Sequence, residues 1–352
     1  MPIPTIPSIR TVWALTTGEA GKVSQAEGLA EALGWPFESI VVRLRRPWLW
    51  SPAHRQPPGL LCCGLEEKLP QPWPGLLISC GRRSVPVAAA VRCAAGGRTF
   101  AVHIQNPRTP LPCFDLIVPL EHDVLAGPNV VATQTALHRV TPVKLAAAGA
   151  EWQERLGNLN VAVLLGGRSR SYRFTRQTLH ELAGGLADLD GDIAITPSRR
   201  TEAGVVDALR ARLPQAWFWD GTGPNPYLGM LALARHIVVT EDSVSMISEA
   251  ISTGKPVYVA EMAGGGRRLG RFHTSLREGG IVRPFDGRLA RWRYEPVNET
   301  PRIAAEVRRR MGAAPAPWTL PRGMPLSQGP GWSATVPANS CVRRFPGEET
   351  SQ

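Results

Sequence analysis

Short apolar runs alternate along the chain with longer amphipathic stretches, and this alternation predicts parallel sheets wrapped by helices. In the first half, residues 11–16 form an apolar run, and residues 24–33 place apolar side chains at helical spacing. Ser24, with Glu27 three positions later, predicts a capping box at the start of that helix. A helix is also expected after Gly81. Further strands of this half are predicted at 76–79, 99–104 and 116–119, with a weaker run at 130–133.

The same pattern repeats after a helical connector at residues 145–156. A strand at 161–165 leads through a loop into a helix that starts near Thr175. Later strands are predicted at 192–196, 216–219, 236–240 and 256–260, with helices between them and a last helix at 301–311. The predicted fold class is therefore α/β, with two doubly wound Rossmann-like domains that face each other across a cleft.

The expected domain organisation follows from this repetition. Residues 1–143 form an N-terminal Rossmann-like domain, and residues 144–312 form a C-terminal Rossmann-like domain. We expect the last helix to pack back on the first domain. Residues 313–352 are rich in Ala, Pro, Gly and Ser without periodicity, which predicts a disordered tail.

Composition describes a globular protein with a basic surface. With 43% hydrophobic and 20% charged residues, the 352-residue chain suits two cores. The net charge of +11 comes mostly from arginines spread along both halves, which disfavours a nucleic-acid-binding stripe. It fits anionic substrates or an acidic membrane surface. The six cysteines form no C-x-x-C pair, so we expect reduced thiols and no metal site.

Localisation is predicted from what the sequence lacks. The first ten residues do not form a signal peptide, and no apolar run approaches the ~20 residues that span a bilayer. We therefore expect a cytoplasmic protein whose contact with the inner membrane is at most peripheral. The aromatic and basic stretch at 43–50 is compatible with such a contact and equally with packing on the domain.

The candidate chemistry lies where ligands of open parallel sheets bind, outside the carboxyl ends of the strands. In the first half these loops are residues 17–25, 80–84, 105–108 and 121–123. In the second half they are residues 166–169, 198–201, 220–223 and 241–245. The second set is rich in glycine, hydroxyl and arginine groups, which hold phosphate well. Neither a Walker A motif nor the dinucleotide fingerprint is present, which disfavours kinases and dehydrogenases.

Glu249 belongs to the most informative stretch, residues 226–259. There Asp242 and Ser243 open a helix that carries Ser245 and then Glu249, so its N-terminus suits a diphosphate and Glu249 suits ribose hydroxyls. The alternative is that Ser243 only caps the helix and Glu249 pairs with an arginine. Likewise, the glycine pair at 166–167 is able to point its amides at an anion or merely to close a turn.

Many motifs in order make the chain resemble the mitochondrial-fission (elongated mitochondria) family, in its bacterial branch, over about residues 10–312. They are G-x-x-G-x-x-x-Q-x-x-GLAEALG at 18–34, GRRSVPVA at 81–88, IQNPR at 104–108, FDLIVPLEHD at 114–123, ALHRVTP at 136–142, LLGGRSRSYRF at 164–174, TPSRRT at 196–201, NPYLGMLA at 225–232, TEDSVSMISEA at 240–250, TGKPVYV at 253–259, RPF at 283–285 and YEPVNET at 294–300. The resemblance implies a fold similar to glycosyltransferase-B enzymes. It also implies that the second domain holds the donor nucleotide at DSVSMISEA, which favours a ligand-binding Glu249.

The sequence departs from the family pattern in the loops. The family usually has His where Lys22 stands, Asn where Ser24 stands and Asp where Asn106 stands. A glycine is expected near Thr135, and Arg235 replaces a common Asp. If the first-domain loop of the family carries a catalytic base, these differences imply that this chain lacks that base or has changed it. Plant members look like adaptors for division dynamins, and bacterial members are often labelled nucleoside-diphosphate-sugar epimerases.

Three functions remain open at this stage. The first is transfer of a sugar from a nucleoside-diphosphate sugar, a substrate rather than a cofactor, to an unknown acceptor. The second is epimerisation of that sugar, and the third is a non-catalytic adaptor. The donor would be held by Gly166, Gly167, Arg168, Ser169, Ser198, Arg199, Arg200, Asp242, Ser243, Ser245 and Glu249. The acceptor-side residues would be Gly18, Gly21, Lys22, Gln25, Arg82 and Arg83. The candidate bases are Glu121, His122 and Asp123, which also suit a structural turn.

Overall fold

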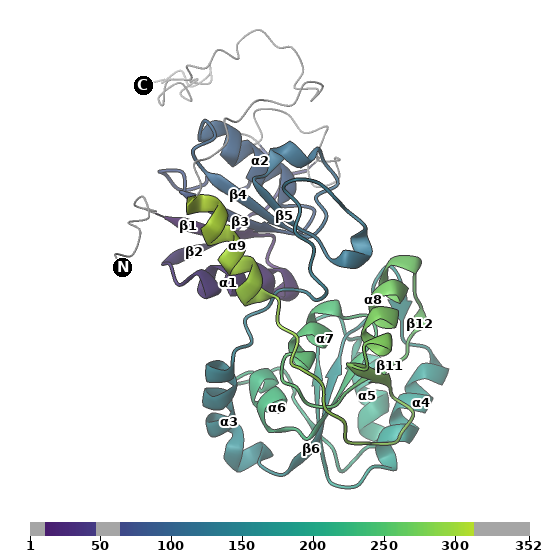
Figure 1. Ribbon diagram of the computed structural model, residues 1–352. Helices are drawn as coiled ribbons and strands as arrows, with labels where there is room; N and C mark the ends of the chain where they lie inside the picture. The colour runs from purple at the N-terminus through teal and green to yellow at the C-terminus, as the bar shows by residue number, and fades with distance from the viewer. Residues whose placement is uncertain (1–10, 47–63, 313–352) are drawn as a thin grey trace, which may run out of the picture.

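Two parallel sheets, each with its own helices, make up the part of the chain that the computed structural model describes, residues 11–46 and 64–312 (Figure 1). The predicted α/β class with two Rossmann-like units is confirmed. The predicted tail at 313–352, residues 47–50 of the aromatic and basic stretch, and Cys62, Cys63 and Cys341 lie outside the described residues. Among the described helices, none is long and apolar enough to cross a bilayer.

The first sheet has the strand order β2-β1-β3-β4-β5. Its strands are β1 (Val12–Thr16), β2 (Phe37–Val41), β3 (Leu76–Cys80), β4 (Phe100–Ile104) and β5 (Leu116–Val118). Alternate side chains of each strand point to opposite faces, so two helical layers cover this sheet. On one face, α1 (Ala20–Leu33) and α9 (Thr300–Gly312) pack together against Val12 and Ala14. On the other face, α2 (Val85–Ala94) packs against Trp13 and Leu15.

The second sheet has the order β13-β11-β10-β6-β8-β9. Its strands are β6 (Leu159–Leu165), β8 (Asp192–Pro197), β9 (Trp217–Phe218), β10 (His236–Thr240), β11 (Val257–Ala260) and β13 (Val282–Pro284). A separate two-stranded antiparallel pair joins β7 (Tyr172–Arg173) to β12 (Ala263–Gly264). The strands of the main sheet are apolar and almost fully buried in β6, β10 and β11, as expected for a parallel sheet covered on both faces.

Six helices cover the second sheet. One core cluster contains side chains from α3 (Pro142–Leu156), α6 (Tyr227–Leu233), α7 (Val244–Ile251) and α8 (Arg267–Glu278). The cluster on the other face contains side chains from α4 (Arg176–Ala187) and α5 (Ala203–Arg212). This arrangement directs the carboxyl ends of the strands of the second sheet toward the first unit (Figure 1).

The chain crosses between the two units twice, once before α3 and once between β13 and α9. The two crossing segments are bonded to each other. The amide of His138 donates to Thr300 Oγ1 at 3.0 Å, and the Thr300 hydroxyl donates to the carbonyl of His138 at 3.2 Å. The Gln134 amide donates to Glu299 Oε1 at 3.1 Å. The two connections therefore form one paired linker.

Two local predictions are wrong. The helix predicted from Ser24 begins at Ala20, so the expected capping box of Ser24 and Glu27 lies inside the helix. Its N-cap is Glu19, which follows directly on Gly18, a residue with φ 84° that lets the chain turn immediately after β1. The predicted strand at 130–133 makes isolated bridges to β5 and the loop after it, because the segment meets them at separated points.

Candidate functional site

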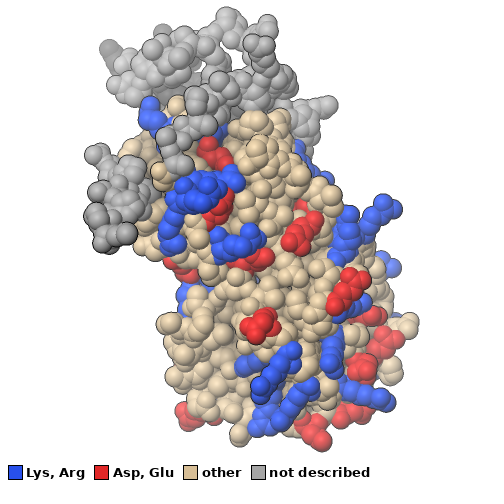
Figure 2. Space-filling model, in the orientation of Figure 1, with Lys and Arg blue, Asp and Glu red and all other residues tan. Residues whose placement is uncertain are grey.

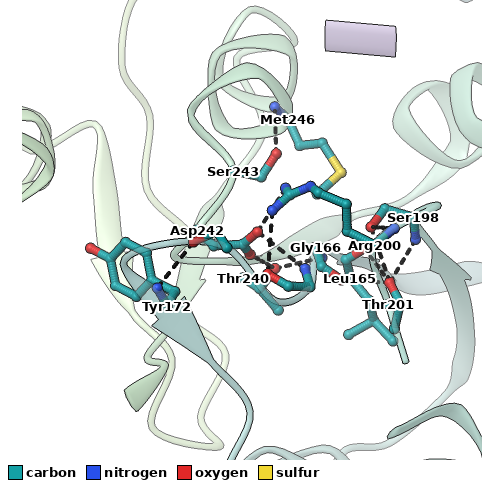
Figure 3. A network of polar contacts seen from close by, with 12 residues as sticks. Leu165, Gly166, Tyr172, Ser198, Arg200, Thr201, Thr240, Asp242, Ser243 and Met246 are labelled. Atoms are coloured by element: carbon teal, nitrogen blue, oxygen red, sulfur yellow. Dashed lines mark hydrogen bonds and ion pairs between the residues drawn. The ribbon is translucent and has the colours of Figure 1, made fainter. Parts of the chain in front are cut away.

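Asp242 is the centre of a polar network where β6, β8 and β10 end (Figure 3). Its side chain is 0% exposed, and it forms an ion pair with Arg200 at 2.8 Å. The carboxylate also accepts hydrogen bonds from Thr240 Oγ1 at 2.8 Å and from the Gly167 amide at 3.1 Å. Three loops predicted to meet at the carboxyl edge of the second sheet are therefore tied together by one buried carboxylate.

The glycine pair is held within this network. Gly166 donates its amide to Thr240 Oγ1 at 2.7 Å, and Gly167 donates to Asp242. A methyl group on Gly166 would overlap the Asp242 carboxylate, and one on Gly167 would overlap the backbone carbonyl of Arg200. Both amides are held by internal acceptors in this structure, and binding of an external anion by them stays a prediction. The glycines are required here by close packing.

The neighbouring arginines take different directions. The Arg200 guanidinium also donates to the Gly167 carbonyl at 3.3 Å. The backbone amide of Arg200 donates to the hydroxyl of Ser198 at 3.2 Å. Arg199 is exposed and reaches the first unit, where it donates to the carbonyl of Gly18 at 3.3 Å. Arg168 is exposed at the end of β6, while the hydroxyl of Ser169 accepts from the Tyr172 amide at 3.0 Å. Thus Arg200 is paired with Asp242, Arg199 contacts the first unit, and Arg168 is exposed.

The N-termini of α1 and α7 meet between the two units. Ser243 caps α7 by accepting from the Met246 amide at 3.4 Å. Ser245 lies against Gly21, where an added Cβ would come within 2.8 Å of the serine Oγ. The buried Gln25 donates to Ser245 Oγ at 3.4 Å and to the Gly21 carbonyl at 2.9 Å. First-turn amides of a helix have no partner within the helix, so two helix N-termini place positive potential at this point.

Glu249 is buried one and a half turns into α7. It is 8% exposed and accepts hydrogen bonds from Tyr227 Oη at 2.6 Å and from Ser24 Oγ at 2.7 Å. Burial raises the pKa of its carboxyl, although both hydroxyl donors act against that shift. The alternative in which Glu249 pairs with an arginine is wrong, because two hydroxyls from different units hold it. Sequence reasoning missed Tyr227 and Ser24 as partners; the NPYLGMLA motif at 225–232 was the available signal.

The acceptor-side loop of the first unit contains its own ion pair. Lys22 donates to Glu19 Oε1 at 2.7 Å, and its aliphatic chain lies over Gly81. Burial opposes ionisation of Glu19, but hydrogen bonds from Lys22 and Thr17 leave the pKa of this carboxyl below its ordinary value. Arg82 and Arg83 follow Gly81 directly and are exposed.

Two of the three candidate bases lie in the contact between the units. The 3-10 helix η4 (Glu121–Asp123) packs against α8, where Asp123 forms an ion pair with Arg268 at 2.7 Å. The His122 ring meets Phe272 edge-on at 5.5 Å. Burial, with smaller effects from nearby arginines, lowers the pKa of His122 to about 4. Of the three residues, Glu121 is the exposed one.

A family model described as "Mitochondrial fission ELM1" matches residues 20–311. The mitochondrial fission protein ELM1 of Arabidopsis thaliana is 33% identical over 275 residues, which cover 68% of this chain and 64% of that protein. The chain thus spans less than two thirds of the plant protein's length. An uncharacterized protein of Rickettsia prowazekii is 25% identical over 351 residues, covering 84% of this chain and 97% of that one.

Solved structures agree with the fold. Os79 from O. sativa, solved in complex with UDP, matches with a TM-score of 0.50 at 12% identity. The match covers 86% of this chain and 91% of the Os79 chain. At this level of identity the likeness shows the fold alone.

Proposed function

The chain belongs to the mitochondrial fission ELM1 family, and we propose that it binds a nucleoside-diphosphate sugar between its two units and transfers the sugar to an acceptor. The observation that carries this proposal is Glu249. A buried carboxylate normally has a cationic partner, yet this one is held by two hydroxyls at the junction of two parallel sheets. Hydroxyl donors are also what a ribose offers.

The diphosphate would bind at the N-terminus of α7. Its first-turn amides and the hydroxyls of Ser243 and Ser245 are donors, and the helix dipole favours an anion there. Arg168 and Arg199, both exposed, would neutralise the charge that grows on the diphosphate as it leaves. Asp242 and Arg200 would hold the surrounding loops in place.

Binding would require the two units to separate. The hydroxyl of Ser24 now occupies one side of Glu249, and Gly21 lies against Ser245. A ribose hydroxyl would replace the Ser24 hydroxyl on the carboxylate, so the hydrogen bond lost on opening is regained from the ligand.

The transfer step follows from this placement. The bond between the anomeric carbon and the phosphate oxygen breaks, and the nucleoside diphosphate leaves with the electron pair. The acceptor hydroxyl oxygen bonds to the anomeric carbon, and its proton passes to a carboxylate base. Glu121 is proposed for this role because His122 and Asp123 are engaged with α8.

The test is ligand binding followed by product analysis. A thermal-shift and calorimetry panel of nucleoside diphosphates and their sugars should find one that raises Tm. Glu249→Gln should weaken that ligand by about tenfold or more, since a charged acceptor becomes neutral. Glu154→Gln, an exposed change on α3, is the matched control.

The outcomes separate the three functions. Product that forms without an acceptor indicates epimerisation, whereas product that needs one indicates transfer. If no nucleotide shifts Tm, the proposal fails and the adaptor remains.

A further inference from the structure

Cationic side chains line the carboxyl edge of the first sheet, opposite the proposed donor site. In the strand order β1-β3-β4-β5, Lys22 follows β1, Arg82 and Arg83 follow β3, and Arg108 follows β4. Neighbouring strands lie about 4.8 Å apart, so these loops stand side by side. Lys22 packs over Gly81, immediately beside Arg82, which joins the first two loops into one surface.

The second unit extends this row through α8. The positive charges of Arg268 and Arg271 add to burial in lowering the pKa of His122. Burial raises the pKa of Asp123, and the charges of Arg268, Arg108 and Arg271 oppose that rise. In Figure 2, basic side chains gather at the junction of the two units around α8. Arginines from two separate units therefore converge beside the loop that carries Glu121.

The carboxylates of this edge do not neutralise it. Glu19 is paired with Lys22, and Asp123 is paired with Arg268. Within residues 11–46 and 64–312, ion pairs to carboxylates include none from Arg82, Arg83, Arg108 or Arg271. Like charges gathered on one face repel each other, which costs stability unless an anion binds there.

The arrangement of Arg82 and Arg83 favours phosphate over a lone carboxylate. They are consecutive, exposed and fixed between β3 and α2 by the tight turn at Gly81, which has φ 89°. The Ser84 hydroxyl closes that turn by donating to the Gly81 carbonyl at 2.7 Å. Guanidinium groups offer planar pairs of donors that match phosphate oxygens, and several such groups match a doubly charged ligand.

We propose that the acceptor carries a phosphate or pyrophosphate group, which Arg82 and Arg83 bind while Arg108 flanks it. That this ligand is the sugar acceptor rests on the proposed function, whereas the anion site does not depend on it. Binding there would place the acceptor's hydroxyl-bearing part between this arginine pair and the donor site, next to Glu121.

The experiment is calorimetric titration of the full chain with pyrophosphate at low ionic strength, with and without saturating UDP. Wild type should bind in both conditions. With UDP filling the proposed diphosphate site at α7, an Arg82→Gln/Arg83→Gln double variant should lose affinity for pyrophosphate by about tenfold or more. Arg98→Gln, an exposed change at the opposite end of the same sheet, should not alter it.

The following outcomes decide the proposal. Loss of pyrophosphate binding in Arg199→Gln with retention in the double variant overturns it, because the anion then sits in the second unit. Binding that depends on Arg82 and Arg83 while no nucleoside diphosphate of the panel binds supports the anion site, and the proposed function then fails. Two further probes distinguish the sources of the phosphate. Binding of glycerol 3-phosphate indicates a soluble acceptor, and binding to phosphatidylcholine vesicles that contain phosphatidic acid indicates a lipid-linked one. Binding to either shows which source the phosphate has, and binding to neither, together with unchanged pyrophosphate affinity in the double variant, overturns the proposal.

Discussion

Replacing Tyr227 by Phe tests whether Glu249 is a charged acceptor in the folded protein. The substitution removes one hydroxyl, which donates to Glu249 Oε2 at 2.6 Å, and leaves the donor Ser24 at 2.7 Å. A hydrogen bond to a charged group contributes about 1.5–3 kcal/mol, against about 1 kcal/mol for a neutral pair. We therefore expect Tyr227→Phe to lower the free energy of unfolding by about 2 kcal/mol above the pKa of Glu249. For a domain of this size that corresponds to a fall in Tm of roughly 4–8 °C.

The matched control is Tyr294→Phe, the same chemical change at a neutral acceptor. Tyr294 donates to the Lys255 carbonyl at 2.6 Å, so its loss should cost about 1 kcal/mol at every pH. The cost of Tyr227→Phe should shrink toward that value as pH falls through the raised pKa of Glu249, where the carboxyl becomes neutral. Urea unfolding of both variants at several pH values measures this. Equal costs with the same pH profile would refute a charged Glu249.

Further predictions concern pH, packing and the contact between the units. Because the pKa of Glu249 is raised in the folded protein, the free energy of unfolding should fall as pH rises from about 4.3, the ordinary Glu value, through the folded pKa. Glu249→Gln should lack this decline. Urea midpoints that change with pH in the same way in wild type and Glu249→Gln would contradict the prediction. Gly167→Ala should lower Tm or solubility because the new methyl overlaps a backbone carbonyl, whereas Gly184→Ala, on a helix with open space, should raise stability by about 0.5–1 kcal/mol. Arg268→Ala should destabilise by about 1–3 kcal/mol, since the Asp123 side chain is 4% exposed, and Asp123→Asn should recover part of that loss in a double-mutant cycle.

The periodicity of the chain was enough to predict the fold class. The run at 236–240 predicts β10 with its observed bounds, because a fully buried parallel strand is a continuous apolar run between polar residues. The edge strands β2 and β13 were missed. Both carry exposed residues, so neither has the apolar run that marks a buried strand.

The partners within the candidate site were beyond local pattern. Ser24 and Glu249 are separated by 225 positions, and nothing near Ser24 distinguishes a helix cap from a side chain that bonds to another unit. The glycine pair at 166–167 showed the same limit, since a short loop suits an anion or a tight turn equally. In the structure the Gly167 amide donates to Asp242, whose role depends on three strands ending at one edge.

The paired linker limits how the molecule can open. The two covalent connections are bonded to each other through Thr300 and His138, so a separation of the units that keeps both connections intact would be a rotation about this paired linker. In such a rotation, the part of the contact between the units that lies farthest from the paired linker would move most. Contacts distant from the linker, such as Asp123 with Arg268, would break first and re-form last, and so would govern how quickly the interior becomes accessible.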